Sequence, residues 1–359
     1  MGRHFLNSAA TLVLLIAPAL SFEKTPDPKL TPTAPTPEQG ALLNQGIALH
    51  DARDYNGAIA KYKQALAGNP DEVGAMYELS FTYFAMKDYE NALALARHGA
   101  EYKSRNLARF YVIIGNSLDD SGRRDDAIEF YRDAIERAPE FQLLHYNMAL
   151  AQRRSGNNAE AKQAIQRALR LDPAHPTSHL LLGTIYKDMG YRLPAVMALS
   201  RFLELEPASA RAAETRAVLQ QLISGNVTKG DQPNRINIQI PPESKKDEGD
   251  FASAEMAVAI SVAAATTEKR KNQSAYQTLV TTYRAMAQTM ANARPGQGFA
   301  ATYYAPYFID LEKAGHVEAF VSQIWAEGQV AGQSDWAQDH GAKIQDFLAW
   351  SQAYRWARN

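Results

Sequence analysis

Small and hydrophobic residues of the chain recur at helical spacing, and one arrangement of them is repeated. Within residues 55–70, "YNGAIAKYKQALAGNP", Ala58, Tyr62 and Ala65 are spaced by four and three residues, which places them on one face of a helix. Pro70 follows, and proline ends a helix because it lacks a backbone donor and clashes with the preceding turn. The pattern predicts an amphipathic helix whose small residues contact a neighbouring helix closely.

Further copies of this arrangement follow at residues 89–104, 124–139, 158–173 and 192–207. Each copy has a small residue at the same position, and these residues are Ala58, Ala92, Ala127, Ala161 and Ala195. Their spacings are 34, 35, 34 and 34 residues. A constant period of this length predicts an array of helical hairpins, in which each hairpin buries its apolar face against the next.

A second series of small residues lies twelve positions before the first and consists of Gly46, Ser80, Gly115, Ala149 and Gly183. With both series and the prolines that end the copies, the chain resembles the tetratricopeptide repeat (TPR) family, with five repeats over about residues 39–207. The resemblance implies an all-α solenoid. Ser104, in place of a terminal proline, and Phe202, in place of a small residue, depart from the family pattern.

The resemblance also implies a concave groove, lined by the first helix of each repeat. The predicted partner-binding residues are Leu43, Ile47, Tyr77, Phe81, Phe84, Val112, Asn116, Tyr146 and Leu150. An apolar, aromatic face marks either a partner site or a surface that the chain itself covers. The clamp by which chaperone-binding members hold a C-terminal carboxylate is absent, because Val112, Thr177 and Leu181 occupy its basic positions. We expect a protein or peptide partner.

The pattern changes after the repeats. Residues 208–224 keep helical spacing without the signature and are predicted to cap the array. Residues 225–249 are polar and rich in glycine and proline, which predicts a linker with few contacts; its isolated "INIQI" is expected to be extended coil, with a strand as the alternative. Residues 250–359 are helical again without the signature and predict a separate small helical bundle domain.

The N-terminus predicts export. Residues 1–21 combine Arg3 and His4 with a short apolar run and the small residues around Pro18, which is the pattern of a secretory signal peptide. The run is far shorter than the roughly 20 residues needed to cross a membrane. Residues 22–38 are a proline-rich linker, expected to act as a spacer. We expect a protein of the bacterial periplasm or the extracellular space, with no transmembrane span in the mature chain.

Composition and candidate chemistry narrow the function. A net charge of −1 argues against a nucleic-acid partner, and the absence of cysteine excludes disulfides and cysteine-based zinc sites. His316 with Glu318, and Asp339 with His340, could bind a metal or move a proton if they converged. No known catalytic or phosphate-binding motif accompanies them. We therefore expect no enzyme activity and no cofactor.

The aromatic residues near the C-terminus admit two interpretations. They are Tyr303, Tyr304, Tyr307, Trp325, Trp336, Trp350 and Trp356. Such rings could stack on a carbohydrate, but a core beside a helix of mostly alanine also needs bulky residues, and we favour the core. Two hypotheses follow: an exported adaptor that holds a peptide or helix of another cell-envelope protein in its groove, or repeats that position a C-terminal enzyme or glycan-binding module. The sequence does not determine the oligomeric state.

Overall fold

The computed structural model of the chain describes residues 24–229, 236–239, 246–265, 267, 273–326 and 330–357. Within these residues the fold is helical apart from one two-stranded sheet, which confirms the predicted all-α class. The predicted signal peptide, residues 1–21, lies outside the described residues. No helix in the described part is both long and apolar enough to cross a membrane.

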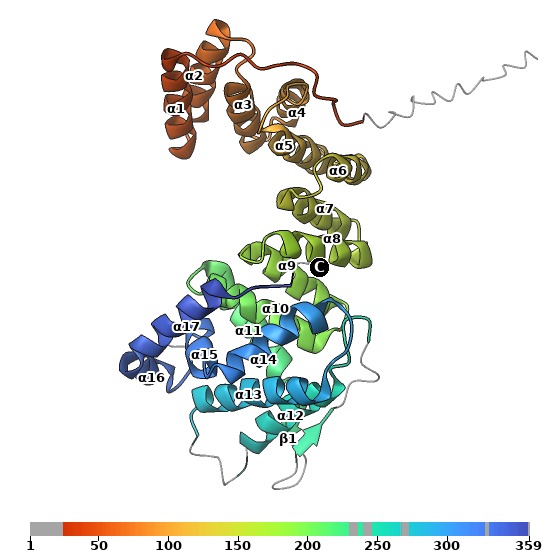
Figure 1. Cartoon of the computed structure of the whole chain (residues 1–359), viewed down its shortest axis with the longest axis vertical. Helices are drawn as coiled ribbons and strands as arrows, with labels where there is room; N and C mark the ends of the chain where they lie inside the picture. The colour runs from red at the N-terminus through yellow and green to blue at the C-terminus, as the bar shows by residue number, and fades with distance from the viewer. Residues whose placement is uncertain are drawn as a thin grey trace, which may run out of the picture.

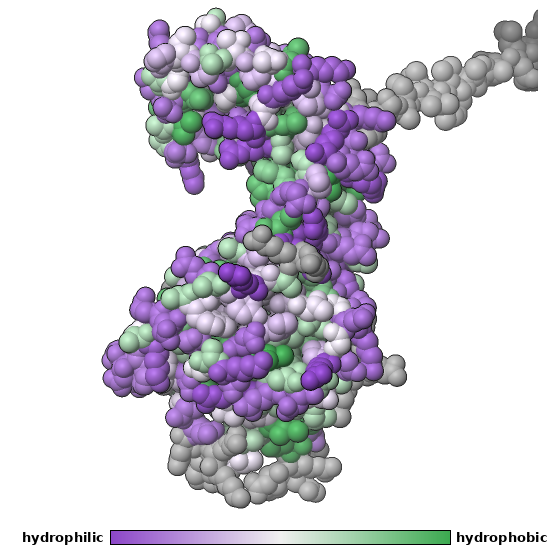
Figure 2. All heavy atoms as spheres, viewed as in Figure 1, coloured by the Kyte–Doolittle hydropathy of each residue, from purple (hydrophilic) through white to green (hydrophobic). Residues whose placement is uncertain are grey.

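Paired helices build the five predicted repeats. They are α1 (Pro37–Asp51), α2 (Tyr55–Gly68), α3 (Val73–Ala85), α4 (Tyr89–Gly99), α5 (Leu107–Asp120), α6 (Arg124–Arg137), α7 (Gln142–Arg154), α8 (Asn158–Leu171), α9 (Pro176–Asp188) and α10 (Arg192–Leu205). The pairs stack into an arc whose inner side is formed by the odd-numbered helices (Figure 1). Figure 2 shows the hollow inside this arc, with apolar side chains along its inner wall.

The turn within each repeat places one residue in the left-handed backbone region. In the last three repeats this residue is Gly122, Gly156 or Gly190, with φ of 91°, 83° and 82°. In the first two it is Arg53 or Lys87, each with φ of 63°. Glycine adopts this conformation without the steric penalty of a Cβ atom. The same turn therefore forms in every repeat, including the two that lack the favoured residue.

The small residues allow the paired helices to approach closely. A Cβ atom on Gly46 would lie 2.3 Å from the ring of Tyr62, and one on Gly115 would lie 2.3 Å from the ring of Tyr131. Both tyrosine rings are buried. These distances leave no room for a side chain, because protein interiors are already close-packed. The close helix contact predicted from the two series is confirmed.

The described part of the proline-rich segment, residues 24–36, lies along the outer edge of the first three repeats (Figure 1). Leu30 forms a parallel β-bridge with Tyr102, in the turn between α4 and α5. The side-chain amide of Asn69, between α2 and α3, donates a 3.2 Å hydrogen bond to the backbone oxygen of Thr33. The expectation that this segment is only a spacer is therefore wrong, because it binds the turns that connect successive repeats.

The second half is helical, as predicted. Its elements are α11 (Ala210–Ser224), β1 (Val227–Lys229), β2 (Ile236–Ile238), α12 (Ala252–Ala265), α13 (Ala275–Ala293), the π-helical turn η1 (Ala300–Tyr304), α14 (Ala305–Lys313), α15 (Val317–Ile324), α16 (Gln333–Asp339) and α17 (Gly341–Ala353). The expectation of coil for "INIQI" is wrong, since β1 and β2 pair antiparallel with Val227 opposite Ile238.

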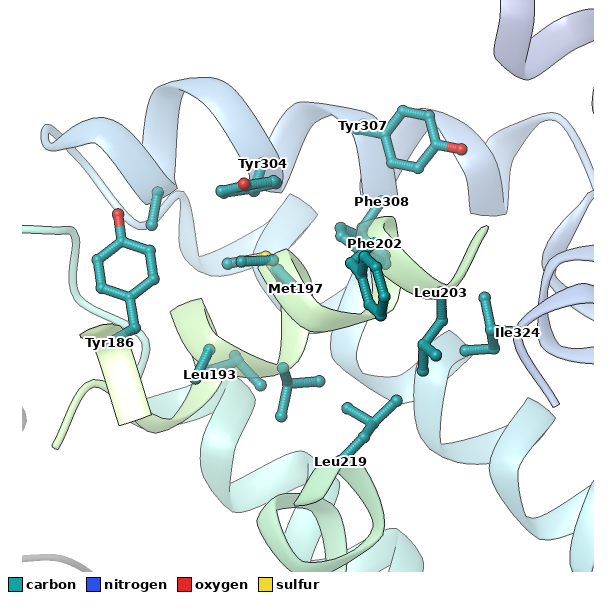
Figure 3. Close-up of a cluster of buried hydrophobic side chains, with 14 of the residues drawn as sticks. Tyr186, Leu193, Met197, Phe202, Leu203, Leu219, Tyr304, Tyr307, Phe308 and Ile324 are labelled. Carbon is teal, nitrogen blue, oxygen red and sulfur yellow. The ribbon is translucent and has the colours of Figure 1, made fainter. Parts of the chain in front are cut away.

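Helix α10, the outer helix of the fifth repeat, is enclosed by the second half. Every residue from Leu193 to Glu204 is buried. In Figure 3, η1 and α14 lie on one side of α10, where Tyr304 is close to Met197, and Leu219 of α11 lies on another. A helix that is apolar around its whole circumference is buried on all sides. One hydrophobic cluster consequently extends from Ala149 to Trp356.

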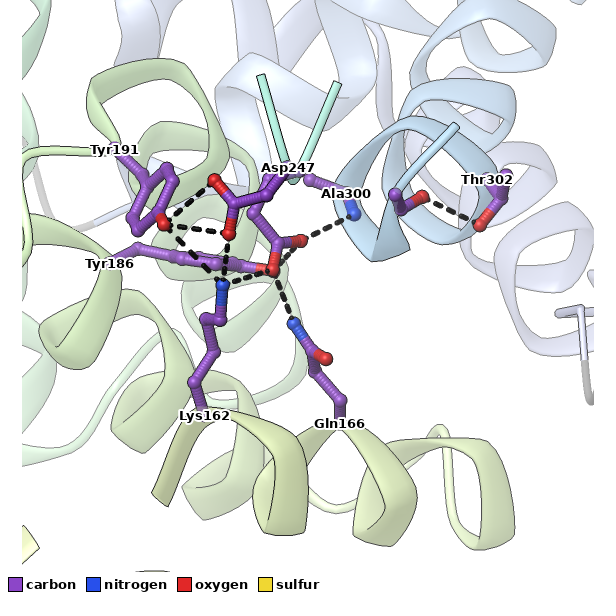
Figure 4. Close-up of polar contacts among 9 residues, drawn as sticks. Lys162, Gln166, Tyr186, Tyr191, Asp247, Ala300 and Thr302 are labelled. Carbon is purple, nitrogen blue, oxygen red and sulfur yellow. Dashed lines mark hydrogen bonds and ion pairs between the residues drawn. The ribbon is translucent and has the colours of Figure 1, made fainter. Parts of the chain in front are cut away.

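A polar cluster joins the predicted linker to the repeats (Figure 4). The carboxylate of Glu248 is buried and accepts hydrogen bonds from the side chains of Gln166 (2.8 Å) and Tyr186 (2.7 Å). It also accepts a 3.1 Å hydrogen bond from the backbone nitrogen of Ala300. One side chain thus connects α8, α9 and η1.

Lys162 of α8 adds an ion pair to this cluster. Its ammonium lies 2.8 Å from the Glu248 carboxylate and 2.7 Å from that of Asp247. Burial alone would lower the pKa of Lys162, but the hydrogen bonds to Asp247 and Glu248 outweigh it and raise the pKa. The expectation of a linker with few contacts is wrong. The predicted boundaries mark where the repeat signature ends, whereas the core continues across them.

Candidate functional site

The predicted groove residues all lie on the first helix of a repeat, on α1, α3, α5 and α7. Among them Phe81 is exposed and the other eight are half-buried. The leader, residues 24–36, contacts the turns between repeats, Tyr111 of α5 and Asp133 of α6, none of which belongs to the predicted set. The nine side chains therefore form a continuous candidate surface on the inner side of the arc, and their role in binding stays a prediction.

A row of near-parallel rings lies in the first part of the groove. Both His50 of α1 and Tyr77 of α3 stack on Phe81, with ring centroids 5.1 and 6.3 Å apart and interplanar angles of 23° and 3°. The guanidinium of Arg109, from α5, lies 5.7 Å from the centre of the Tyr77 ring. Aromatic faces and a cation in one row can bind apolar, aromatic or proline side chains.

Hydrogen bonds fix the orientation of His50 in this row. The Thr82 hydroxyl donates to the backbone oxygen of Glu78 at 2.8 Å, so its oxygen is the acceptor for His50 Nδ1 at 2.7 Å. The proton of the imidazole is thereby assigned to Nδ1. In this tautomer the Nε2 atom of His50 is a hydrogen-bond acceptor at the edge of the ring row.

The three predicted groove rings on α3, those of Tyr77, Phe81 and Phe84, differ in exposure. Of these rings Phe81 alone is exposed, with 39% of its surface accessible. Tyr77 packs edge-on against Phe110, with centroids 5.8 Å apart, and Phe84 contacts Tyr89 at 5.7 Å. Residues at this helical spacing lie along one face of the helix. The side chains at the edge of that face that point toward a neighbouring helix are covered by that helix.

Asn116 is also engaged within the array. Its side-chain oxygen accepts a 2.5 Å hydrogen bond from the hydroxyl of Tyr131, the same ring that fills the space beside Gly115. Nearby, Arg154 of the fourth repeat donates to Asp119 at 2.6 Å across the repeat boundary. The first contact joins the two helices of the third repeat and the second joins the third and fourth repeats, so polar contacts stiffen the middle of the groove.

At the fourth and fifth repeats the groove deepens into a cavity of about 340 Å³. Its lining residues are Tyr146, Leu150, Arg153, Thr177, Leu180, Leu181, Thr184, Lys187, Leu199, Arg211, Glu214, Thr215 and Val218. Two of them, Tyr146 and Leu150, belong to the predicted set. Helix α11, predicted only as a cap, supplies Arg211, Glu214, Thr215 and Val218. These residues are spaced by three and four positions, and this spacing was the signal in the sequence that could have revealed them.

Charged groups surround the apolar wall of this cavity. Asp188 accepts from both Arg153 (3.0 Å) and Lys187 (2.6 Å), so this group of charges retains one positive charge. The hydrogen bond from Arg211 lowers the pKa of Glu206 to about 2. The cavity can accept an apolar side chain, and the charged residues of its lining, which include Glu214, lie around that wall.

The candidate catalytic residues of the second half do not form a site. His316 packs against Trp350, with ring centroids 5.2 Å apart, and Glu318 pairs with Arg284. His340 stacks on Trp336 at 4.5 Å. Among the described residues no group of His, Asp and Glu side chains is arranged to hold a metal ion.

The aromatic residues near the C-terminus mostly fill the core. Tyr303, Tyr304, Tyr307, Trp325 and Trp356 are buried, and the remaining two tryptophans are half-buried. The predicted core interpretation is confirmed.

Family comparisons agree with the repeat geometry. Models of the tetratricopeptide repeat match residues 49–111, and also residues 114–176 and 146–186. Residues 49–186 of the chain therefore consist of tetratricopeptide repeats. The matched residues cover most of the TPR array, from the end of α1 to most of α9.

Similar curated proteins match only part of the chain. Human "Protein O-mannosyl-transferase TMTC3" is 24% identical over 193 residues, which are 50% of this chain and 21% of that protein. The "BBSome complex member bbs-4" of Caenorhabditis elegans is 24% identical over 174 residues, 48% of this chain and 37% of that protein. The chain thus spans well under two thirds of the length of these relatives.

Solved TPR structures resemble about half of the chain. TTC0263, a TPR protein of Thermus thermophilus, has a TM-score of 0.43 at 20% identity, with 52% of this chain and 98% of that chain covered. YrrB, described as a TPR protein with an unusual peptide-binding site, has a TM-score of 0.37 at 18% identity, with 49% and 90% covered.

Proposed function

We propose that the protein is an exported, non-catalytic scaffold whose groove holds a peptide or helix of another cell-envelope protein. The observation that carries this proposal is the exposed ring of Phe81, in a row of stacked rings on the inner side of the arc. Stacked repeats use such concave surfaces to bind partners. A large apolar side chain exposed in the centre of such a surface can serve as an anchor for a partner.

The cavity beside Tyr146 and Leu150 supplies a second anchor position along the same surface. A segment that lies along the groove would place one apolar side chain against the ring row and another in the cavity. Anchors of this type carry most of the binding energy of an interface, while the contacts between them exclude water.

The test compares variants at one exposed position. Phe81→Ser is expected to weaken partner binding at least about 30-fold, because truncation of an anchor costs about 2 kcal/mol or more. Phe81→Tyr keeps the ring and should bind like the parent protein. Ile260→Ser, on α12, is the control outside the groove, because this side chain is also exposed, at 53%.

The partner would be captured on immobilised protein from the envelope fraction of the source cells and identified by mass spectrometry. Its binding segment would then be titrated calorimetrically against the parent and the three variants. Equal affinity of the parent and Phe81→Ser for that segment would refute the groove as the binding site. Loss of binding with Ile260→Ser would place the site on α12.

Export has a separate test. The pattern of residues 1–21 supports cleavage near Leu20 to Phe22. N-terminal sequencing of the protein from fractionated cells should find this new terminus in the envelope or the medium. A protein that retains Met1 and sediments with the cytoplasm would contradict the proposed location.

A further inference from the structure

A second pocket lies outside the groove, where the end of α10 meets α15, α17 and the residues after α17. Its volume is about 980 Å³, and pockets for small molecules usually measure about 300–1,000 Å³. Leu205, Pro207 and Leu348 contribute apolar wall, and Arg201 and Glu204 contribute charge. Such a combination of apolar wall and few charged groups is typical of a small-molecule site.

Arg201 is held rigidly at this pocket. Its side chain is 5% exposed, and its guanidinium lies over the rings of Tyr307 and Trp356 at 5.2 and 5.1 Å. Stacking between a guanidinium and aromatic rings is favourable and fixes the plane of the guanidinium. A donor that is already fixed in position loses little conformational entropy when a ligand binds.

The hydrogen bonds of Arg201 are concentrated on one nitrogen. Its Nη1 atom donates to Glu204 (2.5 Å) and Ser351 (2.7 Å), and Glu204 also accepts from the Tyr307 hydroxyl at 2.8 Å. The Nε atom of Arg201 is buried without a hydrogen-bond partner, and Nη2 donates to no described residue. The carboxylate of Glu204 thus accepts several hydrogen bonds, whereas two nitrogens of the Arg201 guanidinium donate none to the described residues.

The pocket has a positive balance of charge. Among its described lining residues, Arg201 and Arg355 are cationic and Glu204 is anionic, which leaves one positive charge. Arg355 is exposed, so it can reach a ligand at the opening. A buried or half-buried guanidinium prefers a carboxylate, because the two groups form short, parallel, charge-assisted hydrogen bonds.

We propose that this pocket binds a small organic carboxylate with an apolar body. The carboxylate accepts hydrogen bonds from Arg201 and Arg355, and the body packs against Leu205, Pro207 and Leu348. This site is distinct from the groove cavity, because the two share no lining residue. The protein would then combine a partner groove with a separate ligand site.

The test uses octanoate as the probe, titrated into the full mature protein by calorimetry. We expect saturable binding of octanoate at one site. Octanamide, which has the same apolar body without the charge, should bind at least about tenfold more weakly. D-glucuronate, a polar acid, should also bind more weakly than octanoate. Trp356 lies beside Arg201, so tryptophan fluorescence provides a second readout.

Variants assign the binding to this pocket. Arg355→Ala, at an exposed position, should fold normally and weaken octanoate binding about fivefold or more. Arg105→Ala removes an exposed arginine outside the pocket and should have no effect. Arg201→Lys, checked for folding by its melting curve, should weaken binding further, because lysine lacks the planar fork. Phe81→Ser should bind octanoate like the parent protein, whatever its effect on the groove.

The proposal fails if octanoate does not saturate, or if octanamide binds equally well. It also fails if Arg355→Ala and folded Arg201→Lys both keep the affinity of the parent. Tighter binding of D-glucuronate than of octanoate would refute the apolar body that the proposal assigns to the ligand.

Discussion

The second and fifth repeats share one signature but bury their outer helices differently. In α4, the outer helix of the second repeat, the buried residues are the small Ala92, Ala96 and Gly99, so its other face remains open. In α10, the equivalent helix of the fifth repeat, every residue from Leu193 to Glu204 is buried. The signature therefore specifies contacts between neighbouring repeats but does not determine what lies outside them.

This difference has consequences for stability. In the first repeats each hairpin depends on its neighbours and on the leader at its edge, so stability should be local and additive. In the last repeats the apolar core is shared with the second half, as the cluster from Ala149 to Trp356 shows. This part should unfold as one unit. The following predictions test that contrast.

Removal of the chain after Ser224 is expected to have the largest effect. The outer side of α10 would be exposed, including Met197 and Phe202, which are fully buried. Apolar surface of this extent promotes unfolding and aggregation. Hydrogen exchange measured by mass spectrometry should show loss of protection in α9 and α10 but not in α3 to α5. Uniform protection of the whole fragment would show that the repeats do not depend on the second half.

Loss of the Glu248 side chain is expected to be the next most damaging change. Glu248→Ala removes the acceptor of Gln166 and Tyr186 and half of the buried pair with Lys162, which should cost on the order of 3 kcal/mol. Asp247→Asn is the matched control, because Asp247 is 54% exposed, and it should cost less than about 1 kcal/mol. Urea denaturation measures both. Equal costs would mean that burial of the pair is unimportant.

The contrast also shows how far the sequence predicted the fold. Contacts within and between repeats follow a fixed period, so the helices and the close approach of Gly115 to Tyr131 could be predicted. The contact of Glu248 with Tyr186 joins residues that are 62 positions apart. It belongs to no repeated pattern, so the local sequence does not predict it. The burial of α10 did have a signal, because its residues from Leu193 to Leu199 are apolar without interruption.

For the candidate site the limit is the direction of each side chain. Spacing placed Phe81 and Phe84 on the same stripe of α3, yet the structure leaves Phe81 exposed and turns Phe84 onto Tyr89. Whether a ring at the margin of a stripe faces the groove or the next helix depends on its rotamer and on its neighbours. The sequence period predicts the helical face on which a residue lies. The solvent exposure of its side chain depends on how the neighbouring helices pack.

A matched pair of glycine substitutions tests the helix contacts of the first repeats. Gly115→Ala places a Cβ atom against the Tyr131 ring and should cost about 1–3 kcal/mol. Gly40→Ala, on α1, meets no atom within 4 Å. It should gain up to about 1 kcal/mol, because alanine favours the helix more than glycine does. Thermal unfolding by circular dichroism measures both. Shifts of the same sign would show that the small series does not mark the contact.

The last expected effect, an acid sensitivity of the shared core, arises only below the pKa of a free histidine and is absent at neutral pH. His179 Nε2 donates to the backbone oxygen of Pro173 at 2.9 Å, so Nδ1 accepts from the Tyr304 hydroxyl at 2.7 Å and the ring is neutral. Burial lowers the pKa of His179 to about 3, against 6.5 for a free histidine. Between these values the unfolded chain binds one more proton than the folded chain. Stability should therefore fall as the pH falls through this window, by up to about 1.4 kcal/mol per pH unit.

His179→Gln should flatten this slope in urea denaturation, whereas His98→Gln, at an exposed position on α4, should leave it unchanged. An unaltered slope in His179→Gln would assign the acid sensitivity to other groups.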